Sequence, residues 1–314
     1  PAFALATEEV TNDQATASII KDAGDDPDVT HHARIIASVG KGAAGDGITF
    51  AAGEGVGIVT RVGLPVPVGE PAINPVPREM ITRELTALCD HYGVIADFEV
   101  TIGIENGEAL AKYTMNGRLG IVGGLSVLGT TGIVVPYSCA AWIASLHRGI
   151  DVSIAAGANH VIAATGSTSE KAANAIYQLP EYALLDMGDF AGGVLKYLKK
   201  NPVEKLTLAG GFAKFTKLAE GHMDLHSGRS AVNFSWLADE LSNLGAAAAL
   251  VAMCKDANTA MQVLEACKVA NVKIAAHVAK LAQQKAKAIT GPSVAVEVLI
   301  FDRKGKLVGQ SGVT

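Results

Sequence analysis

The chain has 314 residues, of which 49% are hydrophobic and 18% charged, so it can bury a sizeable core and disorder over most of its length is excluded. Its formal net charge is −5 without any cluster of Lys and Arg, which argues against nucleic acid as a partner because neutralising phosphates needs grouped cations. The four cysteines are scattered and form no CxxC pair, so we expect no metal site built from thiolates.

The first part of the sequence has the pattern of short strands joined by turns. Runs of β-branched residues bounded by Gly, Pro and Asp predict strands at residues 34–39, 48–51, 56–62 and 98–104. Five prolines between Arg61 and Arg78 predict an ordered irregular loop, because proline fixes φ and lacks an N–H. Apolar residues at helical spacing then predict a helix from Arg78 to about His91.

A GxGxxG pattern begins at Gly40, directly after a predicted strand. The dinucleotide-binding fingerprint requires a helix next, because the pyrophosphate sits on the helix N-terminus. Residues 46–50 read instead as another strand, so we interpret the pattern as a hairpin turn and reject it as a nicotinamide site.

Residues 119–146 carry no charge, which raises the question of a membrane span. Five glycines, Pro136 and several Ser and Thr make the apolar density low for a span. We expect buried strands and turns here, and no membrane partner.

The second part repeats a strand, a Gly-containing loop and a helical pattern three times, with strands at residues 161–164, 183–187 and 205–209. Helical patterns follow from 234 to about 289, and a last strand covers 294–302. Repeated β–loop–α units imply a parallel sheet with helical crossovers. We therefore expect a two-domain protein of α/β and α+β class: an α+β domain over residues 1–135, and a Rossmann-like α/β domain with a mainly parallel sheet, expected to bind the cofactor, over 136–314.

The three loops of this second part are the candidate ligand site. In open α/β sheets, ligands bind beyond the carboxyl ends of the strands, where helix N-termini offer free N–H groups. One such loop says little, because short loops use Gly, Ser and Asp to cap helices in any case; three together favour a nucleotide-like or adenosyl-like ligand. The candidate cofactor-binding residues are Thr165, Gly166, Ser167, Thr168, Gly188, Asp189, Phe190, Gly210 and Gly211, with Ser167, Thr168 or Ser169 as a helix cap.

Three other segments fit either a ligand site or a plain loop. The aspartates of residues 22–28 could bind a cation, but their spacing is not that of an EF-hand and a solvated turn is favoured. Residues 220–229 hold two histidines four apart that could serve as acid–base partners, although incidental loop histidines are favoured from spacing alone. The proline-rich loop could hold Glu70, Asn74 and Arg78 toward a ligand, or be a structural Ω-loop.

Several stretches, in order through most of the chain, carry a resemblance to a known family. They are IKDAGDDPDVTH at residues 20–31, GEGVGIVTRVGLPVPVGEPAINPVPREMI at 53–81 and NGRLGIVGGLSVLGTTGIVVPYS at 116–138, extended by TGSTSE, GDFAGG and GGFAKFTKLAEGHMDLHS. Together they resemble the cobalt-precorrin-5B (C-1) methyltransferases, the CbiD family. The stretches at 53–81 and 116–138 are highly specific.

The resemblance implies a cytoplasmic enzyme that uses S-adenosylmethionine to methylate cobalt-precorrin-5B, a cobalt–tetrapyrrole, at C-1, giving cobalt-precorrin-6A on the anaerobic-type route to cobalamin. It leaves homo-oligomerisation open and implies no metal held by the protein itself. On this basis we expect substrate contacts from Arg61, Glu70, Asn74, Arg78 and Arg118. For proton transfer we expect the catalytic residues to be Asp25, Asp26 and His226.

Two features depart from the family pattern. Members usually begin with a segment rich in Thr, Gly, Cys and Ala ahead of the aspartates, whereas Pro1 stands close to them, so we expect part of that region to be missing or replaced. Near His226 the family pattern is closer to Thr-His-Ser, and Leu225 stands here. The alternative function is a non-catalytic carrier of a corrinoid intermediate, which would bind tetrapyrrole without measurable affinity for S-adenosylmethionine.

Overall fold

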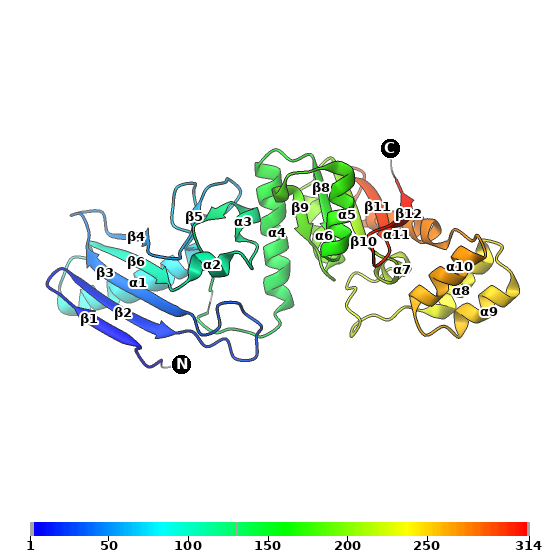
Figure 1. Ribbon diagram of the computed structural model, residues 1–314. Helices are drawn as coiled ribbons and strands as arrows, with labels where there is room; N and C mark the ends of the chain where they lie inside the picture. Colours follow the sequence, from blue (N-terminus) through cyan, green and yellow to red (C-terminus); the bar gives the residue numbers. More distant parts are fainter. Residues whose placement is uncertain (1–2, 130, 313–314) are drawn as a thin grey trace. The chain divides into compact units, whose positions relative to one another are not determined.

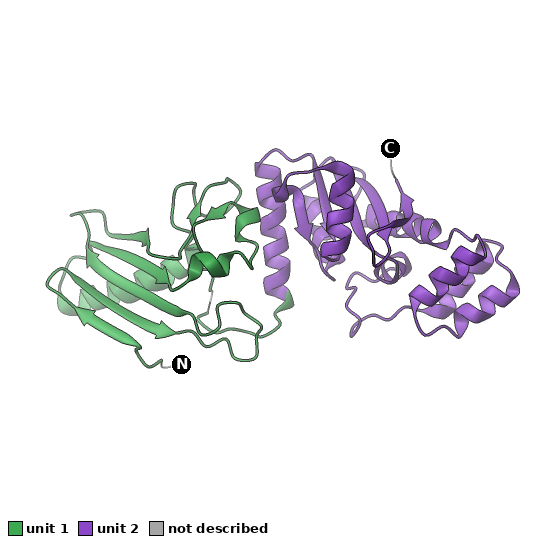
Figure 2. Cartoon of the chain, in the orientation of Figure 1, with its two compact units in different colours: residues 1–139 green, residues 140–314 purple. Residues whose placement is uncertain are grey.

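The computed structural model describes residues 3–129 and 131–312, and it combines helices with parallel and antiparallel strands, so the chain is of mixed α/β class (Figure 1). It divides into two compact units, residues 1–139 and 140–314 (Figure 2). The sequence pattern had suggested a division after residue 135. The units are described separately below.

Unit 1 is built on a five-stranded sheet in the order β1-β2-β3-β6-β4, which is antiparallel except for the parallel β4–β6 pair. Alternate residues of β6, such as Val100 and Ile102, are buried against apolar residues of helix α1 (Pro75–Tyr92), among them Ile81 and Leu85. The strands are β1 (Thr7–Val10), β2 (Gln14–Ile20), β3 (Arg34–Lys41), β4 (Ile48–Ala52) and β6 (Phe98–Ile104).

The hairpin expected at Gly40 is wrong in its strand pairing. β3 and β4 both pair with β6, which lies between them, so the turn joins strands that are not neighbours. The pattern strand–turn–strand cannot show that a strand from later in the chain fills the gap. No helix follows the glycines within the described residues: residues 42–47 form a turn whose Gly45 and Gly47 N–H groups donate to the Asp97 carboxylate, at 2.9 Å each.

The proline-rich loop is irregular as expected, but it ends earlier. Helix α1 (Pro75–Tyr92) begins three residues before Arg78, with Asn74 as its N-cap. Proline is tolerated in the first helical turn, because the N–H groups there have no partner within the helix. The expected strand at residues 56–62 shrinks to β5 (Ile58–Val59), which pairs with β7 (Ile121–Val122).

Residues 119–146 contain less strand than expected. Among its described residues, β7 is the one strand, Leu125 and Val127 form isolated β-bridges, and from Cys139 the chain forms helix α4 (Cys139–Ala155). Two short helices precede this segment: α2 (Gly107–Ala111) and α3 (Asn116–Leu119). Among the described residues, no helix has both the length and the apolar character needed to cross a membrane.

Unit 2 contains the expected β–loop–α units and the expected mainly parallel sheet. Its order is β12-β11-β10-β8-β9, in which only β12 runs antiparallel to its neighbour. The sequence reading ended at β11 and missed β12. The strands are β8 (His160–Ala164), β9 (Leu184–Asp186), β10 (Lys205–Gly211), β11 (Ala295–Phe301) and β12 (Leu307–Ser311).

Helices cover both faces of this sheet. Ile162 and Ala164 face α5 (Ser167–Tyr177), whereas Val161 and Ala163 face the core shared by α4, α6 (Ala191–Lys200), α7 (Phe212–Glu220) and α11 (Ile274–Thr290). Each fully buried Leu or Val of this core contributes about 1.5–3 kcal/mol. The remaining helices are η1 (Glu181–Ala183), α8 (Phe234–Asn243), α9 (Ala248–Lys255) and α10 (Ala260–Val269).

Candidate functional site

The three segments predicted to bind a ligand lie on one edge of the unit 2 sheet. The loop expected at Gly210 and Gly211 is wrong, because both glycines end β10 and α7 begins directly at Phe212. β8, β9 and β10 are parallel, so their carboxyl ends meet there. The Thr165 N–H donates to the Ala209 carbonyl at 2.9 Å, and the Gly188 N–H donates to the Ala164 carbonyl at 3.2 Å. The structure therefore brings the segments at the carboxyl ends of the three strands side by side.

Three helices begin at this edge, and their N-cap residues have no side chain that accepts a hydrogen bond. These N-caps are Gly166 for α5, Phe190 for α6 and Gly211 for α7. The expected cap by a serine or threonine is wrong, because Ser167 is already helical and the Ser169 hydroxyl donates to the Gly166 carbonyl at 2.8 Å. The first-turn N–H groups, at the positive end of each helix dipole, thus have no cap from the N-cap residue.

The glycines of this edge have different roles. Apart from the adjoining residues of the chain, no described atom lies within 4 Å of a Cβ built on Gly166 or Gly211, so there is open space in front of both. A Cβ on Gly210 would lie 2.5 Å from the Thr165 Oγ1 and 2.7 Å from the ring of Phe215. Gly210 is therefore needed for close packing of the end of β10 against Thr165 and Phe215, a role that the sequence pattern does not distinguish from ligand contact.

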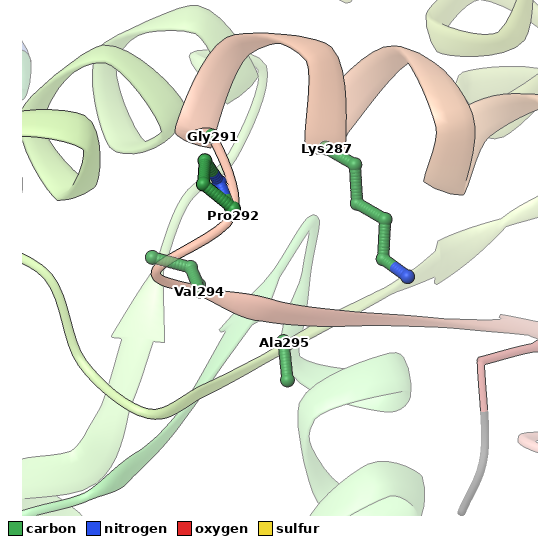
Figure 3. Close-up of a pocket in the computed structure, with 5 residues that line it drawn as sticks. All are labelled: Lys287, Gly291, Pro292, Val294 and Ala295. Atoms are coloured by element: carbon green, nitrogen blue, oxygen red, sulfur yellow. The ribbon is translucent and has the colours of Figure 1, made fainter.

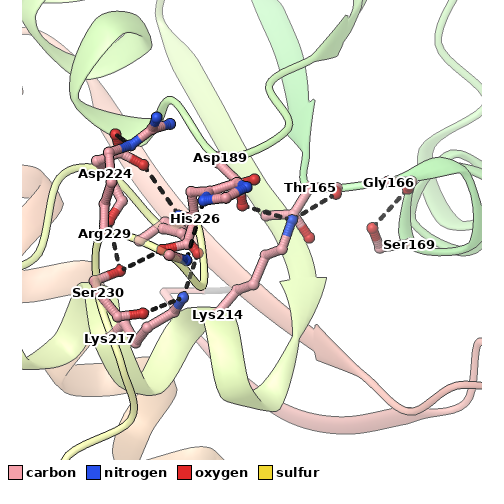
Figure 4. A network of polar contacts seen from close by, with 12 residues as sticks. Thr165, Gly166, Ser169, Asp189, Lys214, Lys217, Asp224, His226, Arg229 and Ser230 are labelled. Atoms are coloured by element: carbon pink, nitrogen blue, oxygen red, sulfur yellow. Dashed lines mark hydrogen bonds and ion pairs between the residues drawn. The ribbon is translucent and has the colours of Figure 1, made fainter. Parts of the chain in front are cut away.

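Lys214, on the first turns of α7, joins these loops and was missed by the sequence reading. Its Nζ lies 2.8 Å from Oδ1 of Asp189 and donates to the Thr165 carbonyl at 3.3 Å (Figure 4). Both side chains of the ion pair are partly exposed, 33% for Lys214 and 22% for Asp189. A cation and an anion are thus held at the carboxyl edge of the sheet, within reach of solvent and of a ligand.

The loop that carries His226 is fixed to α7 by a buried lysine. Lys217 is only 5% exposed, and its Nζ donates to the carbonyls of Leu225 and, at 3.1 Å, of Ser230. Burial lowers the pKa of Lys217 from its usual value. Leu225 fills the core at 0% exposure and its N–H donates to the Asp189 carbonyl at 2.8 Å, so this departure from the family pattern has a packing role.

His226 itself is exposed at the surface of this loop. Its ring Nδ1 accepts a hydrogen bond from the Gly228 N–H at 3.1 Å, and its backbone N–H donates to the Asp224 carboxylate at 3.0 Å. Partial burial would raise the pKa of Asp224, but the hydrogen bonds from His226 and Arg229 outweigh it and the net shift is downward.

The second histidine of this segment, His222, lies 3.5 Å from the Glu220 carboxylate. In the described part of the chain, no three His, Cys, Asp or Glu side chains gather as metal ligands.

In unit 1 the aspartates form a hydrogen-bonded turn, in line with the favoured reading. The Asp22 carboxylate accepts from the Gly24 N–H at 2.8 Å, and Asp28 is paired with Lys21. Asp26 Oδ1 accepts from the Tyr137 N–H at 2.8 Å, while Asp25 is exposed.

Arg78 and Glu70 are engaged with the proline-rich loop itself. The Arg78 guanidinium donates to the carbonyls of Ile73 at 2.8 Å and Pro71 at 3.0 Å, and lies 3.3 Å from the Glu70 carboxylate. These contacts fix the loop to the start of α1, which Asn74 caps only through its backbone. Arg78 therefore acts as a clamp of the loop in this structure.

The loop also contacts the second family-specific stretch. The Arg61 Nη1 donates to the Arg118 carbonyl at 3.3 Å, and the Asn74 N–H donates to the Val127 carbonyl at 2.9 Å. The two stretches that the sequence marked as most specific therefore lie together in unit 1.

A shallow pocket of about 440 Å³ lies elsewhere, between the end of α11 and the start of β11 (Figure 3). It is lined by Lys287, Gly291, Pro292, Val294 and Ala295. Residues at the start of β11 pair with the start of β10, so this pocket belongs to the amino edge of the sheet, opposite to the loops described above. It holds none of the predicted site residues.

Glycine-bearing loops, helix N-termini and an ion pair gathered on the carboxyl edge of a parallel sheet are typical of α/β proteins that bind small molecules. The sequence matches the family model described as CbiD over residues 1–136, and that described as CbiD, C-terminal domain, over residues 224–312. The chain belongs to the CbiD family, which confirms the resemblance noted from its sequence.

Several curated relatives cover almost the whole chain. It is 55% identical over 311 residues to a cobalt-precorrin-5B C(1)-methyltransferase of Brucella abortus, with 99% of this chain and 84% of the relative covered. A protein of the same name from a Bradyrhizobium species is 56% identical over 309 residues, covering 98% and 82%. A crystal structure of a cobalamin biosynthesis protein (cbiD) from Archaeoglobus fulgidus is similar at 24% identity and a TM-score of 0.33, covering 71% of this chain and 68% of that one.

Proposed function

We propose that this protein is the methyltransferase that converts cobalt-precorrin-5B to cobalt-precorrin-6A by methylation at C-1, with S-adenosylmethionine as methyl donor. The observation that carries the proposal is the 55–56% identity, over nearly the whole chain, to relatives that are named for this reaction. The cofactor and the residues that bind it are inferred from the geometry of unit 2, and the substrate contacts from unit 1.

The topology of unit 2 supports a cofactor site between the carboxyl ends of β8 and β10. The chain runs from β8 to β9 on one side and then to β10 on the other, so the strand order reverses between β8 and β10. Such a switch point is where doubly wound, Rossmann-like sheets bind ligands. Thr165, Gly166 and Gly211 lie there, with open space in front of both glycines.

The groups present at this edge fit S-adenosylmethionine. The N–H groups of the first turns of α5 and α7 suit its carboxylate, and Lys214 and Asp189 offer one charge of each sign. Asp186 ends β9, 20 residues after Gly166, which is the place where dinucleotide-binding folds put the acidic residue that binds ribose hydroxyls. The sequence reading missed Asp186, although the end of the second predicted strand would have indicated it.

When bound, S-adenosylmethionine supplies a methyl group attached to a positive sulfur. Ring carbon C-1 of the substrate is the nucleophile, so the protein does not have to provide one. Its residues have to position both partners and exclude water. We assign Thr165, Gly166, Ser167, Thr168, Gly188, Asp189, Phe190, Gly210 and Gly211 to the cofactor side, with Gly210 acting through packing. His226, held by the Lys217 clamp on its loop, is the candidate for moving the proton that the ring releases.

Unit 1 is assigned to the tetrapyrrole. Arg61 and Arg118, on the two family-specific stretches, are suited to its carboxylates because guanidinium groups pair strongly with them. Arg78, Glu70 and Asn74 shape the loop that presents these side chains. Asp25 and Asp26 are the candidates for proton transfer on this side.

The cofactor site is tested by calorimetric titration with S-adenosylhomocysteine, comparing Gly166→Leu with Gly117→Leu. Both glycines have open space in front of them, but Gly117 belongs to α3 of unit 1. We expect Gly166→Leu to abolish binding and Gly117→Leu to retain it. Unchanged binding by Gly166→Leu removes this edge of the sheet from the proposal. Tetrapyrrole binding by the unmodified protein with no heat from the cofactor favours the corrinoid carrier instead.

A further inference from the structure

A tryptophan outside the three loops is held at the same edge of the unit 2 sheet. Trp142 lies on the first turn of α4, and its indole Nε1 donates to the carbonyl of Asp186, the last residue of β9, at 3.3 Å. The hydrogen bond fixes the indole at the carboxyl end of this strand. The side chain nevertheless remains 46% exposed.

The loop after β9 lies beside this indole. Gly188 has φ +55°, in the left-handed region that favours glycine, and a Cβ built on it would lie 3.7 Å from the indole ring. Phe190 follows, with its ring centroid 6.4 Å from that of Trp142 and the planes tilted by 41°. At that distance and angle the two rings are not stacked, so neither covers the face of the other. One face of Phe190 carries the Arg229 guanidinium, with Cζ 5.8 Å from the ring centroid, so Trp142 is the more open of the two rings.

Core packing does not account for this arrangement. A large aromatic side chain that serves only the core is normally covered, whereas Trp142 has its polar N–H satisfied and much of its apolar surface in solvent. A ring that is fixed in place and open on its surface is suited to stack on a planar ligand at little cost in entropy. The ligand that the neighbouring Gly188 and Asp189 are assigned to contains such a plane, its adenine.

We propose that Trp142, together with Phe190, forms an aromatic wall that stacks on the adenine ring of S-adenosylmethionine. This inference rests on the proposed function and deepens it. Asp186 then has two roles. Its carbonyl orients the Trp142 indole, and its carboxylate lies at the strand end assigned to the ribose. Trp142 is a binding residue that selects a purine base and takes no part in the chemistry.

The chain has two tryptophans, Trp142 and Trp236, so the wall is tested by fluorescence. In the Trp236→Phe protein, S-adenosylhomocysteine should change the emission of the remaining indole, Trp142, as the ligand saturates the site. In the matched Trp142→Phe protein it should leave the emission of Trp236, on α8, unchanged. A response from Trp236 alone overturns the assignment.

Affinity gives a second readout. Loss of one aromatic–base stack raises the Kd by about 5- to 150-fold. Trp142→Ala should therefore weaken the binding of S-adenosylhomocysteine by that factor, while Trp142→Phe retains most of the affinity. S-ribosylhomocysteine, which lacks the base, should bind the wild type and Trp142→Ala equally. Equal weakening of both ligands by Trp142→Ala contradicts adenine stacking and indicates a general structural role.

These outcomes separate the two proposals. If S-adenosylhomocysteine produces no heat with the wild type, the cofactor assignment itself fails. If it binds but neither the Trp142 emission nor the Trp142→Ala affinity changes, the aromatic wall is refuted and the proposed function stands. Should Trp142→Ala fail to fold, the emission of Trp236→Phe still decides the question.

Discussion

The Nζ of Lys214 lies 2.8 Å from Oδ1 of Asp189, which joins the start of α7 to the loop after β9 at the edge where the cofactor is proposed to bind. We expect the Lys214 ammonium to donate a hydrogen bond to the bound ligand. A hydrogen bond to a charged group contributes about 1.5–3 kcal/mol, so Lys214→Met should raise the Kd for S-adenosylhomocysteine by about 10- to 150-fold. Calorimetry measures this change. Lys268→Met, which removes an exposed lysine paired with Glu265, is the control and should bind as the wild type does. An unchanged Kd for Lys214→Met would place the cofactor elsewhere.

Lys217→Met tests the clamp on the His226 loop. The substitution leaves two buried carbonyls without their donor, which should lower the free energy of unfolding by about 1–3 kcal/mol. Hydrogen exchange at residues 224–230 should also become faster. Lys196→Met, at an exposed position of α6, should change neither. If the loop exchanges as slowly in Lys217→Met as in the wild type, the lysine is not what holds it.

His160 predicts a pH dependence of stability. Burial, and then the nearby Lys205, lower the pKa of His160 below 6.5. As the pH falls below 6.5 the unfolded chain takes up the proton first, so stability is lost over the window between 6.5 and the lower folded pKa. The groups that face the ring are the Thr207 hydroxyl at 2.8 Å, the Tyr177 ring, Lys205 and the buried Glu297.

The measurement is the melting midpoint from about pH 8 to about pH 5 for the wild type and His160→Gln. At acid pH the melting midpoint of His160→Gln should fall less than that of the wild type. His91→Gln, which changes an exposed histidine on α1, should keep the wild-type decline. Identical profiles for the wild type and His160→Gln would show that another group causes the acid loss.

Three glycines of unit 1 meet backbone to backbone. A Cβ built on Gly107 or on Gly124 would lie 2.2 Å from the Gly55 carbonyl oxygen. Gly107→Ala should therefore lower the free energy of unfolding by about 1–3 kcal/mol, because the clash is with backbone and cannot be relieved by a rotamer change. In Gly117→Ala the new methyl meets open space, and stability should stay within about 0.5 kcal/mol or rise slightly. Urea unfolding gives both values, and equal values would contradict the close approach.

The sequence predicted the elements whose signal is local. Each strand of the β–loop–α units is a short apolar run with Gly at or just after its carboxyl end, and a parallel sheet follows from the intervening helices. β1 and β2 were missed because TEEV and QATASII lack a continuous apolar run, and β12 because it is short and contains Gly309. The placement of β6 between β3 and β4 depends on pairing across many residues, which no local pattern encodes.

The candidate site was predictable to a similar degree. Gly and Ser after the strands predicted segments that the structure gathers at one edge of the sheet, because loop composition reflects the backbone there. Lys214 and Lys217 are two lysines of one helix, and in the sequence AKFTKLAE nothing separates an ion-paired lysine from a buried one. Their difference arises from the partners that the fold supplies: the Asp189 carboxylate for one, and the carbonyls of a later loop for the other. Trp142 was missed because it precedes the β–loop–α units.

The central claim is tested most directly by anaerobic incubation of the protein with cobalt-precorrin-5B and S-adenosylmethionine, followed by mass spectrometry of the tetrapyrrole. The proposed function predicts a product heavier by one methyl group, formed together with S-adenosylhomocysteine and absent with Gly166→Leu. A tetrapyrrole that binds and is recovered unmethylated, with no S-adenosylhomocysteine formed, would contradict methyl transfer and identify the protein as a carrier.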